Sequence, residues 1–258
     1  MAISLATSLR PTVYRRRASI AVPSDARQSQ NHILKSLSAE ARARIYPHLK
    51  LIPLTLGAVI CESGHRMRHI YFPTDTMVSL VHVLEAGACA EVAVVGNEGA
   101  VGVSLFMGGE TTTTRAVVQN TGHAYRLSGA RLKREFERHE EMHRLLLRYT
   151  QSLITQMSQT AVCNRHHSVD QQLCRWLLLS LDRLGSNDLV MTHELIANML
   201  GVRREGITDA AGRLQRSGII RYKRGRIAVI DRAQLEKLCC ECYRAVKKET
   251  DRLRVMDR

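Results

Sequence analysis

The chain has 258 residues, of which 45% are hydrophobic and only 4% aromatic, so we expect two domains with largely aliphatic cores. Its formal charge of +14 favours a nucleic acid or an anionic membrane as partner, with an ordinary solvated basic surface as the alternative. No segment approaches the roughly 18 to 20 uninterrupted apolar residues of a membrane-spanning helix, so we expect a cytoplasmic protein.

Residues 1–30 form the first segment. Arg10 and three consecutive arginines, Arg15 to Arg17, precede the first acidic residue, Asp25. We expect a disordered basic leader. An organellar transit peptide has a similar composition and is the alternative.

Residues 31–129 contain short apolar runs separated by turn residues. The clearest runs are Leu51–Leu56, Ile70–Phe72, Met77–Leu84, Val92–Val95 and Ala116–Val118. Many short strands with glycine between them are typical of an antiparallel barrel or roll. A parallel α/β sheet would require intervening helices, and none fit here. We therefore expect a β-roll sensor-like domain.

Residues 130–166 have a helical period of apolar positions. Positions alternately four and three apart form a heptad seam, which consists of Met142, Leu146, Tyr149, Leu153, Gln156, Thr160 and Cys163. We expect one long helix whose apolar seam residues, Met142, Leu146, Tyr149 and Leu153, pack against a second copy of the chain. Packing of this helix on its own sheet is the alternative.

Residues 167–250 begin with an amphipathic helix over Val169–Leu184, which stops at Gly185. Thr192 can then cap a second helix that ends at Gly201. A helix-turn-helix needs a small residue at the helix crossing, which is Ala197, and a turn residue, which is Gly201. The apolar residues that would close the angle between its helices are Ile196, Leu200, Val202, Ile207 and Ala210. An ordinary helical hairpin would fill only one or two of these positions by chance.

The second helix of this motif carries polar residues at its N-terminus, where recognition helices meet base edges. The expected base-reading residues are Arg204, Glu205, Thr208 and Asp209. Arg204 can donate two hydrogen bonds to guanine, and Glu205 can accept one from cytosine. Two short apolar strands around a basic, glycine-containing turn then predict a β-hairpin wing. The expected phosphate contacts are Thr192, Arg203, Arg213, Lys223, Arg224 and Arg226.

The order of β-roll, long helix and winged helix-turn-helix resembles the Crp/Fnr family of bacterial regulators from about residue 30 onward. The stretch GVRREGITDAAGRLQRSGIIRYKRGRIAVID resembles that family's recognition helix and wing. The resemblance implies an α+β regulator of transcription that reads a near-palindromic DNA site as a homodimer and acts with RNA polymerase. It assigns base reading to Arg204 and Glu205. Asp209 stands where studied members carry another Arg, so we expect a different half-site and a pair between Asp209 and Arg213.

The resemblance also allows a test for cyclic nucleotides, which such family members hold with a Gly-Glu pair and an Arg. Here Gly102 is followed by Val103, and Thr114 stands at the position of the Arg. Arg115 is displaced by one residue, which turns it to the opposite face of a strand. We therefore expect no cyclic nucleotide, and the effector is unknown. The alternative function is a cyclic-nucleotide or other small-molecule receptor with DNA binding as its output.

Seven scattered cysteines indicate reduced thiols. None precedes Cys61, which speaks against the iron-sulfur cluster of the family's redox members. We expect Cys239, Cys240 and Cys242 to fan around one C-terminal helix as packing thiols, with no metal bound. The histidines His65, His69, His82, His166 and His167 lack ligand spacing. With no nucleophile-base pair or phosphate-cradling loop in the sequence, we expect no enzyme.

Overall fold

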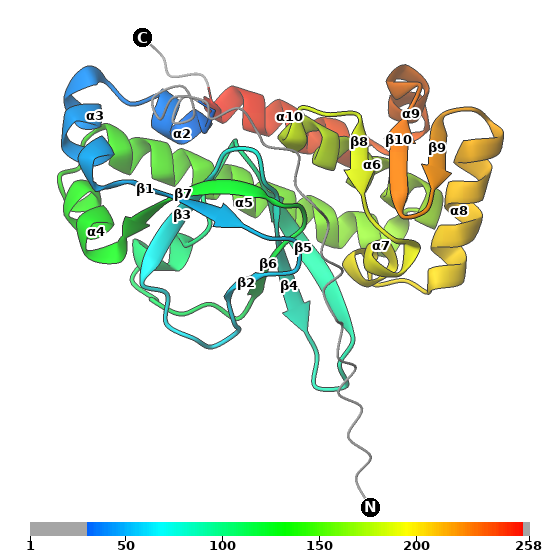
Figure 1. Ribbon diagram of the computed structural model, residues 1–258, viewed down its shortest axis with the longest axis horizontal. Coiled ribbons are helices and arrows are strands. Elements are labelled where there is room, and N and C mark those ends of the chain that lie inside the picture. Colours follow the sequence, from blue (N-terminus) through cyan, green and yellow to red (C-terminus); the bar gives the residue numbers. More distant parts are fainter. Residues whose placement is uncertain (1–29, 255–258) are drawn as a thin grey trace, which may run out of the picture.

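The computed structural model describes residues 30–254. The expected basic leader over residues 1–30 lies outside this range except for its last residue. Figure 1 shows a β-roll and a winged helical domain side by side, with the long helix α5 (Glu141–His166) running past both. No helix among residues 30–254 is long and apolar enough to cross a membrane.

The roll consists of two antiparallel sheets, as predicted. One sheet has the order β1 (Lys50–Leu54), β7 (Gly122–Ser128), β3 (His69–Pro73). The other has the order β2 (Val59–Cys61), β6 (Arg115–Val118), β4 (Val78–Val83), β5 (Cys89–Val95). The sequence runs located β1, β3, β4, β5 and β6. Strand β2 is only three residues long, and polar residues and glycine interrupt β7, so neither stood out as an apolar run.

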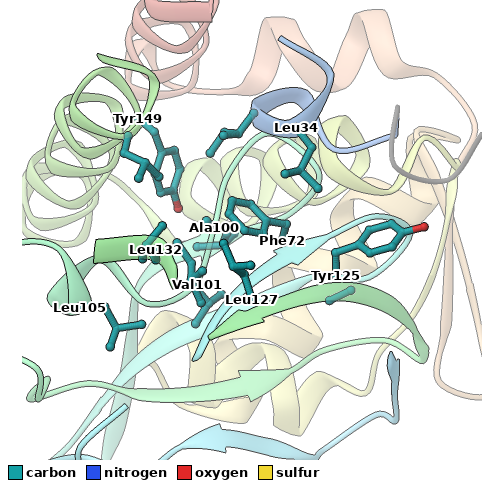
Figure 2. Close-up of a cluster of buried hydrophobic side chains, with 14 of the residues drawn as sticks. Leu34, Phe72, Ala100, Val101, Leu105, Tyr125, Leu127, Leu132 and Tyr149 are labelled. Carbon is teal, nitrogen blue, oxygen red and sulfur yellow. The ribbon is translucent and has the colours of Figure 1, made fainter. Parts of the chain in front are cut away.

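Short helices cover one side of the roll. Asn31 and Ser38 cap α2 (His32–Lys35) and α3 (Ala39–Ile45) by accepting hydrogen bonds from backbone N–H groups. Figure 2 shows Leu34 of α2 and Tyr149 of α5 pointing toward Phe72 at the centre of the roll core. The roll core therefore extends beyond the sheets to these helices.

The expected single helix over 130–166 is two helices. α4 (Gly129–Glu137) ends before α5 begins at Glu141, and His139 between them has a positive φ of 57°. A residue with left-handed backbone angles interrupts the hydrogen bonds of a right-handed helix. Both helices are amphipathic, so the apolar period alone did not mark the break.

The expectation that the heptad seam faces a second copy is wrong. Its apolar members Met142, Leu146, Tyr149 and Leu153 are at most 8% exposed within one chain and belong to the roll core. Further along, the side chain of Gln156 bonds both backbone groups of Val94 on β5, at 2.9 and 3.1 Å. An apolar stripe is buried against the nearest apolar surface, which here is the chain's own sheet.

The C-terminal domain follows directly. Its elements are α6 (Val169–Leu184), β8 (Asp188–Val190), α7 (His193–Leu200), α8 (Arg204–Arg216), β9 (Ile220–Lys223), β10 (Arg226–Val229), α9 (Arg232–Leu238) and α10 (Glu241–Arg254). Ser168 and Gln171 cap α6 reciprocally, and Gly185 ends it in the left-handed conformation. The core of this domain includes Met77 and Val81 from the roll, so the two domains share a packed boundary.

Helix α10 returns along α5. The hydroxyl groups of Ser152 on α5 and Thr250 on α10 lie 2.9 Å apart, and the Gln151 amide donates to Glu249 at 3.2 Å. Figure 1 shows α10 in red beside the green α5. The last helix of the C-terminal domain therefore contacts α5, which packs against the roll.

Candidate nucleic-acid interface

Helices α7 and α8 form the predicted angle around an apolar centre. The Thr192 hydroxyl accepts a hydrogen bond from the N–H of Leu195 at 3.2 Å, and Gly201 takes the required positive φ of 65°. The closing residues Ile196, Ala197, Leu200, Ile207 and Ala210 are buried, and Val202 is half-buried. This packing fixes the direction in which the outer face of α8 points.

The outer face of α8 begins with Arg203 as N-cap residue, followed by the exposed residues Arg204, Glu205, Thr208 and Asp209. The Arg204 side chain is 67% exposed and lies 4.0 Å from Glu194 of α7, a distance at which an exposed ion pair holds the guanidinium only weakly. The first turn of α8 therefore presents a cation and a carboxylate that are free to meet a ligand.

Thr208 is held from two sides. Its hydroxyl donates to the carbonyl of Arg204 and lies 3.1 Å from Nδ1 of His193. The His193 ring stacks on Tyr222 of β9 with 4.1 Å between ring centroids. Burial and the charge of Arg204 lower the pKa of His193, so this ring is neutral near pH 7. His193 and Tyr222 link α7, α8 and the wing, and the sequence reasoning missed both.

The wing is the hairpin β9–β10. Arg224 and Gly225 at its tip both have positive φ, at 50° and 74°, as a tight hairpin turn requires. The carbonyl of Gly225 accepts from the N–H of Met191 at 2.8 Å, which fastens the tip beside the start of α7. Four exposed cations, Arg221, Lys223, Arg224 and Arg226, line an open hollow of about 1030 Å³ between wing and roll.

Arg213 has a different partner from the one predicted. Its Nε and Nη2 donate to the two carboxylate oxygens of Asp170 on α6 at 2.8 and 2.6 Å. The pair expected between Asp209 and Arg213 is therefore wrong. Asp170 lies in the first turn of α6, where the packing of α6 on α8 brings it to Arg213. Asp209 stays on the exposed face of α8.

A second feature is a cavity of about 600 Å³ between the roll and α5. Val103 and Thr114 line it, and none of its lining residues is Lys, Arg, Asp or Glu. Arg115 points to the other side of β6, where its Nε lies 3.1 Å from Glu62. The strand geometry thus places Thr114 inward and Arg115 outward, as the sequence predicts.

The cysteines are not arranged as expected. The expected helix is interrupted between α9 and α10. Cys239 and Cys240 therefore precede the helix that contains Cys242. Cys163, His167, Cys240 and Cys242 lie with their ligand atoms within 4.8 Å of one another. The expectation that the three C-terminal cysteines fan around one helix without converging is therefore wrong. The expectation that His167 has no ligand spacing is wrong as well. Cys163 and His167 are four residues apart, which was the available signal.

Comparison with known proteins agrees with this architecture. The model of the Crp-like helix-turn-helix domain matches residues 171–238, and that of the cyclic nucleotide-binding domain matches residues 52–139. A winged helix-turn-helix joined to a roll of this kind defines a DNA-binding transcription regulator. Together the two models match more than half of the chain, and the chain belongs to the Crp/Fnr-type transcriptional regulators. No curated protein matches it.

Several solved structures share the fold. A putative Crp/Fnr-family regulator from Eubacterium rectale is 18% identical with a TM-score of 0.63, covering 80% of this chain and 96% of that one. FixK2 from Bradyrhizobium japonicum is 15% identical with a TM-score of 0.63, covering 74% and 98%. A CRP-family regulator from Thermus thermophilus is 20% identical with a TM-score of 0.62, covering 72% and 95%. At such identities the likeness shows the fold alone.

Proposed function

We propose that this regulator reads a near-palindromic DNA site as a homodimer, with α8 in the major groove and the wing on the phosphate backbone. The supporting observation is the exposed first turn of α8, where Arg204, held only weakly by Glu194, and Glu205 lie beside a basic wing. Arg204 reads guanine and Glu205 reads cytosine, while Thr208 and Asp209 face the next base pairs. Thr192, Arg203, Lys223, Arg224 and Arg226 approach phosphates.

A homodimer places two copies of α8 in successive major grooves. The buried seam is unavailable for this contact, but the opposite face of α5 exposes Leu147, Ile154 and Val162, each by 46% to 55%. Leu147 and Ile154 are seven residues apart, which aligns them along one helix face. We assign the dimer contact to this outer face. The regulator acts in the cytoplasm by binding, in contact with RNA polymerase, and catalyses no reaction.

The cavity between roll and α5 supports a second function, the reception of a small neutral or apolar molecule. Its lining contains Met67, Leu80, Leu153 and Met157 and no Lys, Arg, Asp or Glu. A cyclic phosphate buried there would lack a cation to balance it. Ile154 belongs both to this lining and to the outer face of α5. A molecule in the cavity would therefore touch the dimer contact.

The DNA-binding proposal is tested by band-shift assays with genomic fragments at several salt concentrations. R204Q should lower the affinity for the selected fragment by about 10- to 100-fold and relax the choice of base at one position in each half-site. R216Q is the matched control, because Arg216 is an exposed cation at the far end of the same helix. Fragment choice and affinity that survive both R204Q and E205Q would overturn the proposal.

A further inference from the structure

Four side chains able to bind a metal meet where α5, α6 and the α9–α10 link come together. Cys163 lies in the last turn of α5, and His167 follows it four residues later. Cys240 directly precedes α10, and Cys242 lies in its first turn. Three sulfur atoms and one ring nitrogen thus converge from segments about 75 residues apart in the chain, with all four atoms within 4.8 Å.

Two of the separations match the edges of a tetrahedron around one ion. The Sγ atoms of Cys163 and Cys240 are 3.6 Å apart, and Sγ of Cys242 is 3.6 Å from Nδ1 of His167. With Zn–S of about 2.3 Å and Zn–N of about 2.0 Å, tetrahedral angles give S–S edges of about 3.8 Å and S–N edges of about 3.5 Å. A disulfide, by contrast, requires about 2.05 Å between sulfur atoms.

The surroundings are those of a closed site. Cys163, Cys240 and Cys242 are at most 4% exposed, and the His167 side chain is 14% exposed. While Nδ1 of His167 faces Cys242, its Nε2 lies 3.4 Å from the carboxylate of Glu241. Metal-bound histidines are usually oriented in this way, with the second ring nitrogen on a carboxylate or carbonyl.

The local charge also suits a thiolate-bound dication. Three thiolates around a dication leave one net negative charge. Arg175 is 3% exposed, is held by a hydrogen bond to Thr160 at 3.1 Å, and acts on Cys163 through its positive charge. Its guanidinium therefore balances the remaining charge.

We propose that Cys163, His167, Cys240 and Cys242 bind a single zinc-class cation. Tetrahedral coordination by sulfur and nitrogen favours zinc among the divalent metals, and a spacing within 4.8 Å suits one ion better than a cluster of several. The bound ion fastens the start of α10 to the end of α5. Because α10 belongs to the DNA-binding domain, the ion fixes that domain against α5, the helix that packs on the roll.

The first test uses the full chain, purified under reducing conditions without chelators. Elemental analysis should find about one zinc ion per chain. Replacement by Co²⁺ should give the intense visible bands of a tetrahedral cobalt centre and a thiolate-to-cobalt charge-transfer band in the near ultraviolet, and added Zn²⁺ should remove both. Neither readout involves DNA, so this proposal can fail while the DNA-binding function stands, and the reverse.

Variants then identify the ligands. C163S and C240S should each lower zinc affinity by more than about 100-fold, because loss of a ligand exceeds the 10- to 100-fold effect of an outer partner, and E241Q should lower it by about tenfold. C174S and C61S are matched controls, since both remove a buried thiol outside the proposed ligand set and should retain the metal. H167Q changes a half-buried side chain and keeps the test open if a cysteine variant fails to fold.

Specific results would overturn the proposal. One is wild-type protein that contains no stoichiometric metal and gives only the pale spectrum of octahedral Co²⁺. Another is a metal that stays bound at wild-type affinity in both C163S and H167Q. Loss of the cobalt bands in the folded control C174S, with retention in C163S, would likewise show that the ligand set is wrong.

Discussion

Arg183 on α6 and Glu98 in the roll form a buried ion pair, with 2.8 Å between Nε and Oε1. Their side chains are only 6% and 9% exposed, and Arg183 also donates to the carbonyls of Val94 and Leu179. Removing one partner leaves the other charge buried and unpaired. Replacing both partners with apolar residues of similar volume leaves no buried charge. The pair therefore enforces one docking of the C-terminal domain on the roll.

We expect R183M to lower the free energy of unfolding by about 3 kcal/mol, because Glu98 is then buried unpaired. The double variant R183M/E98Q should recover part of this loss. Denaturant titration followed by circular dichroism measures both values. A single variant as stable as wild type would show that water reaches Glu98.

Glu91 on β5 makes stability depend on pH. Burial raises its pKa from 4.5 to about 7, although the hydrogen bond from Ser79 and the charge of Arg175 favour the carboxylate. The folded chain therefore binds more protons than the unfolded chain between these values, and the stability contributed by Glu91 falls as pH rises from 4.5 to 7. The difference amounts to about 3 kcal/mol.

E91Q removes this titration while keeping a hydrogen-bonding side chain. Relative to wild type, E91Q should gain stability steadily from pH 4.5 to pH 7 and no more above it. The melting temperatures of E91Q and wild type are compared at each pH and at matched ionic strength. Because both proteins share the other titrating groups, the contributions of those groups cancel in the difference. A difference independent of pH would contradict the raised pKa.

The helix-turn-helix was predictable from sequence because its determinants are local. Thr192 caps, Gly201 turns and Ile207 closes the angle, all within one short segment, and the structure places each accordingly. The direction of the α5 seam was not predictable in this way. A heptad period states that one face of a helix is buried, but the partner depends on which apolar surface lies nearest in three dimensions.

The metal-type cluster was harder still. Cys163 and Cys240 lie 77 residues apart, and only the return of α10 along α5 brings their sulfur atoms to 3.6 Å. The sequence also suggested a continuous helix through Cys239–Cys242, whereas α9 ends at Leu238. Convergence of this kind is decided by tertiary packing and has no short-range signature apart from the i, i+4 pair of Cys163 and His167.

The outer face of α5 gives a test of the homodimer. L147K/I154K introduces lysines where two copies would meet, so like charges would face each other across the symmetry axis. The variant should sediment at micromolar concentration with the mass of one chain, 29.0 kDa, while wild type sediments as a dimer. L84K, a lysine at an exposed leucine of the roll, is the control and should remain dimeric.

Arg213 and Arg224 should differ in their contribution to DNA binding. Arg224 is an exposed cation at the wing tip, whereas Nε and Nη2 of Arg213 already donate to Asp170. The slope of log affinity against log salt is negative, and R224Q should make it shallower by about 0.9 per chain. The reason is that one phosphate contact and its released counterion are lost. R213Q should leave the slope unchanged. Equal slopes for R213Q and R224Q would show that Arg213 leaves Asp170 for a phosphate, and D170N would then strengthen binding by freeing the guanidinium in advance.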